Sequence, residues 1–370
     1  MTKESETKTA ARKPELGTWR IMKNVVIISF AFMLHFTAYS GVVNLQSSIN
    51  AEAGLGMASL AAVYVGLIFS NIFLPPIVIK WVGTKWAISL SFVTYMPYVA
   101  AQLWPTVYTL IPTALILGLG GGPLWTSQCT YFAVVSDAHS KLSKIPAEAI
   151  LSRFLGLFFM IFLMNQVWGN LISSLVISTG DNVAAVTAVN ESLIPQLCGA
   201  SFLPSVDAEK ALQEQPPEKI QMIAGIYLAC MACAALAVAI GVDSIKRYST
   251  DRSGSGAGHS ALALLTATTK FFTEPYQLML TILLIFNGYQ QAFFTSDFTV
   301  AFVSCAIGPG TVGFIMTSYG VSAAVGCLVT GYLAKLITAI YSKVGKRRRF
   351  PTAHFGCRWA ASLRTPRLPM

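Results

Sequence analysis

Charge is scarce in this chain. Asp, Glu, Lys and Arg make up only 11% of its 370 residues, whereas hydrophobic residues make up 54%. A soluble domain carries about a quarter charged residues, so this composition excludes an ordinary soluble protein. Apolar stretches of about 20 residues recur along the chain, and each is long enough to span the hydrocarbon core as a helix. We therefore predict an all-α polytopic membrane protein.

Carboxylates are absent from the middle of the apolar stretches. Glu148 and Glu274 lie at the edges of such stretches, and Asp297 lies at an outer end. Carriers driven by protons or sodium usually place ionisable groups inside the membrane. His35 lies well within an apolar stretch, but a lone His is more often a structural residue. The pattern argues against a proton-coupled carrier, although a uniporter needs no such group.

Motifs for catalysis and metal binding are also missing. The sequence has no phosphate-binding loop and no arrangement typical of a nucleophile triad. Cys230 and Cys233 form a C-x-x-C inside an apolar stretch without a second pair, which argues against a zinc or redox site. Cys198 and Cys305 map to the exterior side or its edge and could pair in an oxidising lumen. We expect a protein that is not an enzyme and has no cofactor or metal.

Eight apolar segments are long enough to span a membrane. They are residues 24–43, 58–79, 86–103, 107–135, 149–177, 221–242, 275–296 and 308–340. They divide the chain into a tail (1–23), a six-helix bundle (24–242), a linker with Gly and Ser (243–274), two further helices (275–342) and a basic tail (343–370). This is the layout of a major-facilitator-like fold that contains its first six-helix half and two helices of the second.

Basic residues alternate between the two sides of the predicted membrane. All but two of the 26 Lys and Arg residues fall in alternate connections, and the two exceptions lie in the loop 180–220. Cytosolic loops are enriched in Lys and Arg, so we expect both termini in the cytosol and the loop 180–220 outside. The N-x-S sequon at Asn190 lies in that loop and predicts a glycan acceptor. Lys80, Gly83 and Lys85 form a basic cytosolic connection.

The basic tail 343–370 holds eight of the 26 Lys and Arg residues and no Asp or Glu. The part of the tail up to about Arg349 matches an inner loop. It is a cluster of basic residues beside a span, and such a cluster could bind anionic lipid. We expect residues 350–370 to be disordered and to result from truncation, splicing or a shifted frame. Without the tail, the formal net charge falls from +10 to about +2, which is not the profile of a nucleic-acid-binding protein.

Small and polar residues gather in two of the predicted spans. Small residues let membrane helices approach closely, so we favour packing for the glycines; the alternative is ligand binding, with a helix break near a cavity at Pro123. Amides in a span could face a central cavity or make hydrogen bonds between helices, and we favour hydrogen bonds. The candidate residues are Gly120, Gly121, Gly122, Gln128, Tyr131, Asn165 and Asn170.

Three sequence stretches carry a resemblance to a known family. They are NLQSSIN (44–50), LGLGGGPLWTSQCTYFA (117–133) and GYQQAFFTSDFTVAFVSCAIGPGTVGFIMTSYG (288–320). Over roughly residues 22–335 the chain resembles the uncoordinated-93 (unc-93-like) family, a branch of the major facilitator superfamily. The resemblance implies a twelve-span parent, so this chain looks like a truncated form that ends after eight spans.

The resemblance also implies a function. Some members of the family are regarded as regulatory subunits of potassium channels, and another subgroup escorts receptors between membranes. It therefore implies a protein that regulates or escorts another membrane protein, with a potassium channel favoured. The plasma membrane is the favoured location over endolysosomal or endoplasmic reticulum membranes. The alternative function is a facilitator-type secondary transporter of a small solute.

Overall fold

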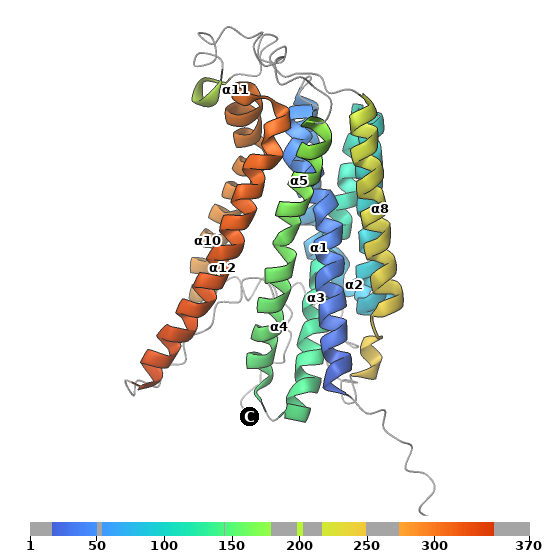
Figure 1. Ribbon diagram of the computed structural model, residues 1–370. Helices are drawn as coiled ribbons and strands as arrows, with labels where there is room; N and C mark the ends of the chain where they lie inside the picture. The colour runs from blue at the N-terminus through green and yellow to red at the C-terminus, as the bar shows by residue number, and fades with distance from the viewer. Residues whose placement is uncertain are drawn as a thin grey trace, which may run out of the picture.

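The computed structural model describes residues 17–49, 54–143, 145–178, 198–202, 217–248 and 274–343, and within these ranges every regular element is helical. The long helices run roughly side by side in an elongated bundle (Figure 1). Six segments of the described chain are long and apolar enough to cross a membrane. The predicted class, an all-α polytopic membrane protein, is confirmed.

The described residues include eight long helices. They are α1 (Thr18–Ile49), α2 (Leu55–Ala100), α3 (Val107–Ser143), α4 (Ala147–Phe162), α5 (Met164–Ser178), α8 (Pro217–Gly241), α10 (Pro275–Ala292) and α12 (Val312–Lys343). Short elements connect or extend them: η2 (Ala101–Leu103), η4 (Gly199–Ser201), η5 (Ile245–Arg247), the π-helix η6 (Phe293–Ser304), α11 (Cys305–Ile307) and η7 (Pro309–Thr311).

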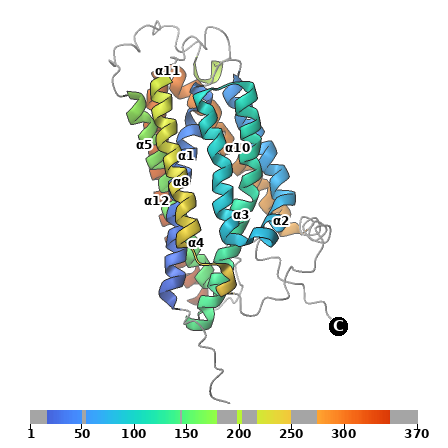
Figure 2. The same ribbon diagram turned by 90° about the vertical axis from the view of Figure 1, so that its right-hand side faces the viewer.

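Helix α2 contains two predicted spans, which fold back on each other at Gly83. The backbone there is not helical (φ 77°, ψ 163°), a conformation that glycine adopts without steric cost. The hydroxyls of Ser59 and Tyr98 lie 3.0 Å apart. In a straight helix these two residues would be roughly 58 Å apart, so the two arms must be antiparallel (Figure 2). The predicted connection between these two spans is therefore present, as a tight bend at Gly83 between Lys80 and Lys85.

The ends of the predicted spans need correction, whereas their number does not. Six segments qualify by length and composition, but Leu55–Leu103 contains two arms, and α12 adds a helix of 32 residues. The segments thus follow the predicted order. Their ends differ because backbone hydrogen bonding continues beyond the apolar part: α1 begins at Thr18 and α3 continues to Ser143. The predicted fifth span is divided at Leu163 into α4 and α5.

The predicted glycine cluster lies where α3 packs against the arms of α2. A Cβ atom added to Gly120 would lie 1.8 Å from Thr94 Oγ1, and one added to Gly122 would lie 2.5 Å from Ser70 Oγ. One added to Gly121 would also lie 2.5 Å from a side-chain carbon of Leu67. Helix α3 stays helical through Pro123, so the predicted alternative of a helix break at this point is wrong. Neighbouring packing sustains the helix where proline removes one hydrogen bond.

Aromatic side chains fill the centre of the bundle. Phe32 on α1 lies at their middle, with its ring centroid 5.2 Å from that of Phe92, 5.5 Å from Trp125 and 5.2 Å from Phe158. These edge-on contacts join α1 to α2, α3 and α4. Helix α1 is therefore the central element on which the polar sites described below are built.

Candidate functional site

The predicted residues Asn165 and Asn170 lie where α5 crosses α1. Ser40 Oγ donates to Asn165 Oδ1 at 2.6 Å, and Asn44 Nδ2 donates to Asn170 Oδ1 at 2.7 Å. Asn44 Nδ2 also lies 3.3 Å from Gln166 Oε1. These five residues form the α1–α5 amide seam. Four of these residues are buried, so neither lipid nor water reaches them: Ser40, Asn44, Asn165 and Asn170. Hydrogen bonds between the two helices satisfy their polar groups instead.

Two glycines bring the backbones of α1 and α5 together beside this seam. A Cβ atom on Gly169 would lie 2.2 Å from the carbonyl oxygen of Thr37, and one on Gly41 would lie 2.0 Å from Tyr227 Oη. Tyr227 Oη, on α8, donates to the carbonyl oxygen of Gly169 at 2.6 Å. Helices α1, α5 and α8 therefore meet at one point, and side chains larger than hydrogen would separate them.

Helix α12 also packs against α5. Ser174 Oγ donates to the carbonyl oxygen of Gly310 at 2.8 Å. A Cβ atom on Gly313 would lie 2.1 Å from the carbonyl oxygen of Asn170. The amide seam thus connects the first six-helix part of the chain to α12. The chemistry of the seam is hydrogen bonding between helices. Asn44 Oδ1 is the one amide oxygen of the seam that lacks a hydrogen-bond partner among the described residues.

Gln128 and His35 are buried elsewhere in the bundle. Cys129 Sγ lies 3.3 Å from Gln128 Oε1, and Gln128 Nε2 has no hydrogen-bond partner in the described part of the chain. The imidazole of His35 stacks on Phe92 with centroids 4.2 Å apart, and Tyr95 meets its edge. Aromatic packing therefore encloses His35. Among the described residues no group of three or more His, Cys, Asp or Glu could hold a metal ion.

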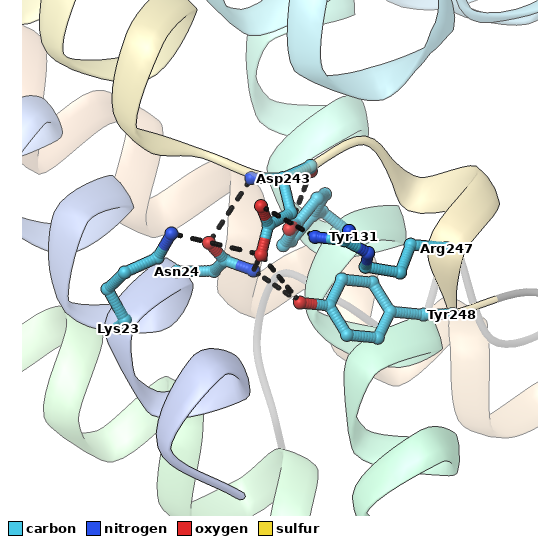
Figure 3. Close-up of polar contacts among 6 residues, drawn as sticks. All are labelled: Lys23, Asn24, Tyr131, Asp243, Arg247 and Tyr248. Carbon is cyan, nitrogen blue, oxygen red and sulfur yellow. Dashed lines mark hydrogen bonds and ion pairs between the residues drawn. The ribbon is translucent and has the colours of Figure 1, made fainter. Parts of the chain in front are cut away.

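A second polar site surrounds Asp243, just after the end of α8 (Figure 3). Asn24 Nδ2 on α1 donates to Asp243 Oδ2 at 3.3 Å, and the Asp243 backbone N–H donates to Asn24 Oδ1 at 3.2 Å. Tyr248 Oη donates to the same carboxylate oxygen at 3.0 Å. The predicted residue Tyr131, on α3, donates from Oη to the carbonyl oxygen of Asp243 at 2.9 Å.

Two cations complete this Asp243 cluster. Arg247 Nη1 lies 3.3 Å from Asp243 Oδ1, and Lys23 Nζ lies 3.8 Å from Oδ2. The side chain of Arg247 is 40% exposed and that of Asp243 is 20% exposed, so solvent weakens this ion pair. The hydrogen bonds are the stronger part of the cluster. They connect α1 and α3 to the end of α8 and to the segment that follows α8.

Tyr248 acts as a hydrogen-bond donor within this cluster over the whole physiological pH range. Burial, together with the hydrogen bond to Asp243 and the charge of that carboxylate, raises the pKa of Tyr248 to about 12. The phenol therefore stays protonated at neutral pH. Sequence reasoning predicted Tyr131 but missed Asp243, Asn24 and Tyr248. The available signal was an acidic residue directly after an apolar span and shortly before Lys246 and Arg247.

The remaining predicted positions lie at the ends of the bundle. Lys80 is exposed, and Lys85 Nζ lies 5.5 Å from the ring centroid of Trp86. Cys198 and Cys305 form a disulfide with Cα atoms 5.7 Å apart. This disulfide adjoins α11, at the end of the bundle opposite to the start of α1 (Figure 1). Asn190 and the tail beyond Lys343 lie outside the described residues.

Comparisons with known proteins give a consistent result. The family model described as "Ion channel regulatory protein UNC-93" matches residues 46–358. Protein unc-93 homolog A from Xenopus laevis is 37% identical over 318 residues, which cover 85% of this chain and 68% of that protein. Homolog A from Homo sapiens is 33% identical over 317 residues, with the same coverage. The "putative potassium channel regulatory protein unc-93" of Caenorhabditis elegans is 31% identical over 322 residues, which cover 86% of this chain and 45% of that protein.

Proposed function

Because the chain belongs to the UNC-93 family of ion channel regulatory proteins, we propose that it is a non-enzymatic membrane protein that regulates a potassium channel. The observation that carries this proposal is the family match, which extends over most of the chain. It also confirms the family resemblance expected from the sequence. The name of the Caenorhabditis elegans relative supports potassium as the ion of the channel.

The polar chemistry of the bundle supports a regulatory role. The amides of Asn165 and Asn170 bond to the neighbouring helix α1, and the hydroxyl of Tyr131 bonds to the backbone at Asp243. These groups are occupied in contacts between helices of the same chain, so they are not free to bind a solute. The enclosed imidazole of His35 is a poor site for a coupling proton because aromatic rings surround it.

A facilitator-type transporter of a small solute is the second candidate. The observation that favours it is the buried Gln128 Nε2, which lacks a hydrogen-bond partner among the described residues. A buried polar donor without a partner is costly, and a bound solute could accept from it. This candidate predicts solute uptake that is lost in Gln128→Leu.

We further place both termini in the cytosol and the protein in the plasma membrane. The first residues of α1, the Asp243 cluster and the last turns of α12 lie at one end of the bundle (Figure 1). That end carries Lys23, Lys246 and Arg247, as cytosolic ends usually do. A glycan on Asn190 and anionic lipid at residues 343–349 fit this orientation. The proposed cytosolic tail and linker remain the predicted ranges 1–23 and 243–274.

Co-purification with defined channel subunits tests the proposal. The tagged full chain is co-expressed with individual potassium channel subunits, solubilised in mild detergent and isolated. We expect at least one subunit to co-elute with the chain and to be absent when an unrelated multi-pass protein carries the tag. If no subunit co-elutes with a well-folded chain, while proteoliposomes take up a solute in a manner that depends on Gln128, the transporter candidate replaces the regulator.

A further inference from the structure

The Cys198–Cys305 disulfide joins two parts of the chain that meet only in the fold. Cys198 lies in the connection between α5 and α8, within the first six-helix part. Cys305 begins α11, directly after η6, in the part that follows the predicted linker 243–274. The two cysteines are 107 positions apart in the sequence, and their Cα atoms are 5.7 Å apart. The disulfide therefore bonds the end of η6 covalently to the six-helix part.

An apolar contact lies beside this disulfide. Phe202, which follows η4, packs against Val300 and Ala301 of η6, and both of these η6 residues are buried. Gly199 comes directly after the bonded cysteine and has a φ of 75°, a conformation that glycine adopts without steric cost. A Cβ atom on Gly199 would lie 3.7 Å from the ring of Phe302. The disulfide and the apolar contact thus act between the same two segments of the chain.

The beginning of α12 contacts the six-helix part close to this disulfide. The carbonyl oxygen of Gly310 accepts from α5, and Val312 and Met316 belong to the same hydrophobic core as the buried residues of the six-helix part. A Cβ atom on Gly320 would lie 2.7 Å from the Cβ atom of Gln166 on α5. Near α11, helix α12 thus lies beside α5, and it diverges from α4 toward the other end of the bundle (Figure 1).

We propose that the Cys198–Cys305 disulfide is a clamp, which keeps the two parts of the chain together at the α11 end of the bundle and leaves α10 and α12 able to move at the opposite end. Packing contacts and a hydrogen bond can separate and form again, whereas a disulfide holds its two Cα atoms within about 7 Å of each other. Helix α12 has 32 residues and is therefore roughly 48 Å long. A tilt of about 10° at the clamped end would move its far end by roughly 8 Å.

The opposite end of the bundle has contacts of another kind. The Asp243 cluster connects α1 and α3 to the end of α8, and all three helices belong to the six-helix part. Within the described residues, the hydrogen bonds of this cluster do not extend to α10 or α12. One end of the bundle thus has a covalent bond between the two parts, and the other end has a polar cluster within one part. This asymmetry is what a hinge at the α11 end requires.

Hydrogen exchange measured by mass spectrometry tests the clamp. The purified full chain in lipid nanodiscs is compared before and after graded reduction with a phosphine, and peptide mapping after alkylation identifies the preparation in which Cys198 and Cys305 alone have been reduced. We expect exchange in η6, α11 and the first turns of α12 to become faster by on the order of tenfold, because a local opening there no longer has to break a covalent bond. Exchange in α3 should stay the same, and reoxidation should restore the slow exchange.

Distances between spin labels test the movement. Labels carried by noncanonical amino acids leave the cysteines intact, and they replace exposed residues: Trp104 and Ile307 at the α11 end, Leu142 and Val329 at the opposite end. Electron–electron resonance should give a narrow distance distribution for the first pair and a broad one for the second. In Cys198→Ser/Cys305→Ser the first distribution should broaden as well. The matched control is Cys230→Ser/Cys233→Ser, which removes two free cysteines of α8 and should change neither distribution.

Two results would overturn the proposal. Faster exchange along all the helices after reduction would show that the disulfide stabilises the whole fold and is not a local clamp. Equally narrow distance distributions at both ends of the wild-type chain would show that α12 does not move against the six-helix part. If the double serine variant does not fold, the same pair of distances is measured on the wild-type chain after graded reduction. None of these results depends on whether the chain regulates a channel or transports a solute.

Discussion

Gly169→Leu is expected to prevent formation of the folded bundle. A Cβ atom at this position would already lie 2.2 Å from the carbonyl oxygen of Thr37 and 3.1 Å from the amide nitrogen of Gly41. Both are backbone atoms of α1, so relief requires that α1 and α5 move apart. That movement would break the hydrogen bonds of the amide seam and of Tyr227 Oη to Gly169. Overpacking with the loss of a buried polar network belongs to the most damaging kinds of substitution.

The measurement is the monodisperse fraction of the detergent-solubilised chain in fluorescence-detected size-exclusion chromatography. We expect a loss on the order of tenfold for Gly169→Leu, as for other severe core substitutions. Gly225→Leu is the matched control, because Gly225 is exposed on α8 and a Cβ atom there has nothing within 4 Å. A wild-type profile for Gly169→Leu would show that α1 and α5 do not cross closely at this point.

Asp243→Ala is expected to destabilise one end of the bundle. It removes the acceptor for Asn24 Nδ2 and Tyr248 Oη, and it leaves Lys23 and Arg247 without their carboxylate. Each partly buried group that loses its partner costs about 1–3 kcal/mol. The melting temperature of the purified chain should therefore fall by several degrees, and the segment that begins with η5 should become more accessible to protease.

Two variants separate the hydrogen bonds of the Asp243 cluster from its ion pairs. Asp243→Asn keeps an oxygen acceptor and should lose less stability than Asp243→Ala. Arg247→Ala removes an exposed cation, for which we expect at most about 1 kcal/mol. If Arg247→Ala were as damaging as Asp243→Ala, ion pairing and not hydrogen bonding would hold the cluster together.

Hydropathy along the chain predicted the class and the order of the segments because both depend on local composition. Lys80, Gly83 and Lys85 indicated a connection at this point, but its tightness, a reversal of direction at the single residue Gly83, required the structure. The end of α3 at Ser143 was missed for a different reason. Helical hydrogen bonding does not stop where apolar residues stop.

The amide seam and the Asp243 cluster were harder to predict than the helices, because both are formed by residues that meet only in the folded chain. Asn165 and Asn170 could be recognised as a polar patch, but their partners Ser40 and Asn44 lie more than 120 residues away in the sequence. The Asp243 cluster is likewise made by helix ends that meet only in the fold.

Potassium current is the most direct measure of the proposed function. The channel subunit that co-purifies with the chain is expressed alone, with the wild-type chain, or with Gly169→Leu. We predict that the wild-type chain changes the current amplitude or its voltage dependence, that Gly225→Leu does the same, and that Gly169→Leu has no effect. Identical currents with and without a folded chain at the cell surface would contradict the assignment of this protein as a channel regulator.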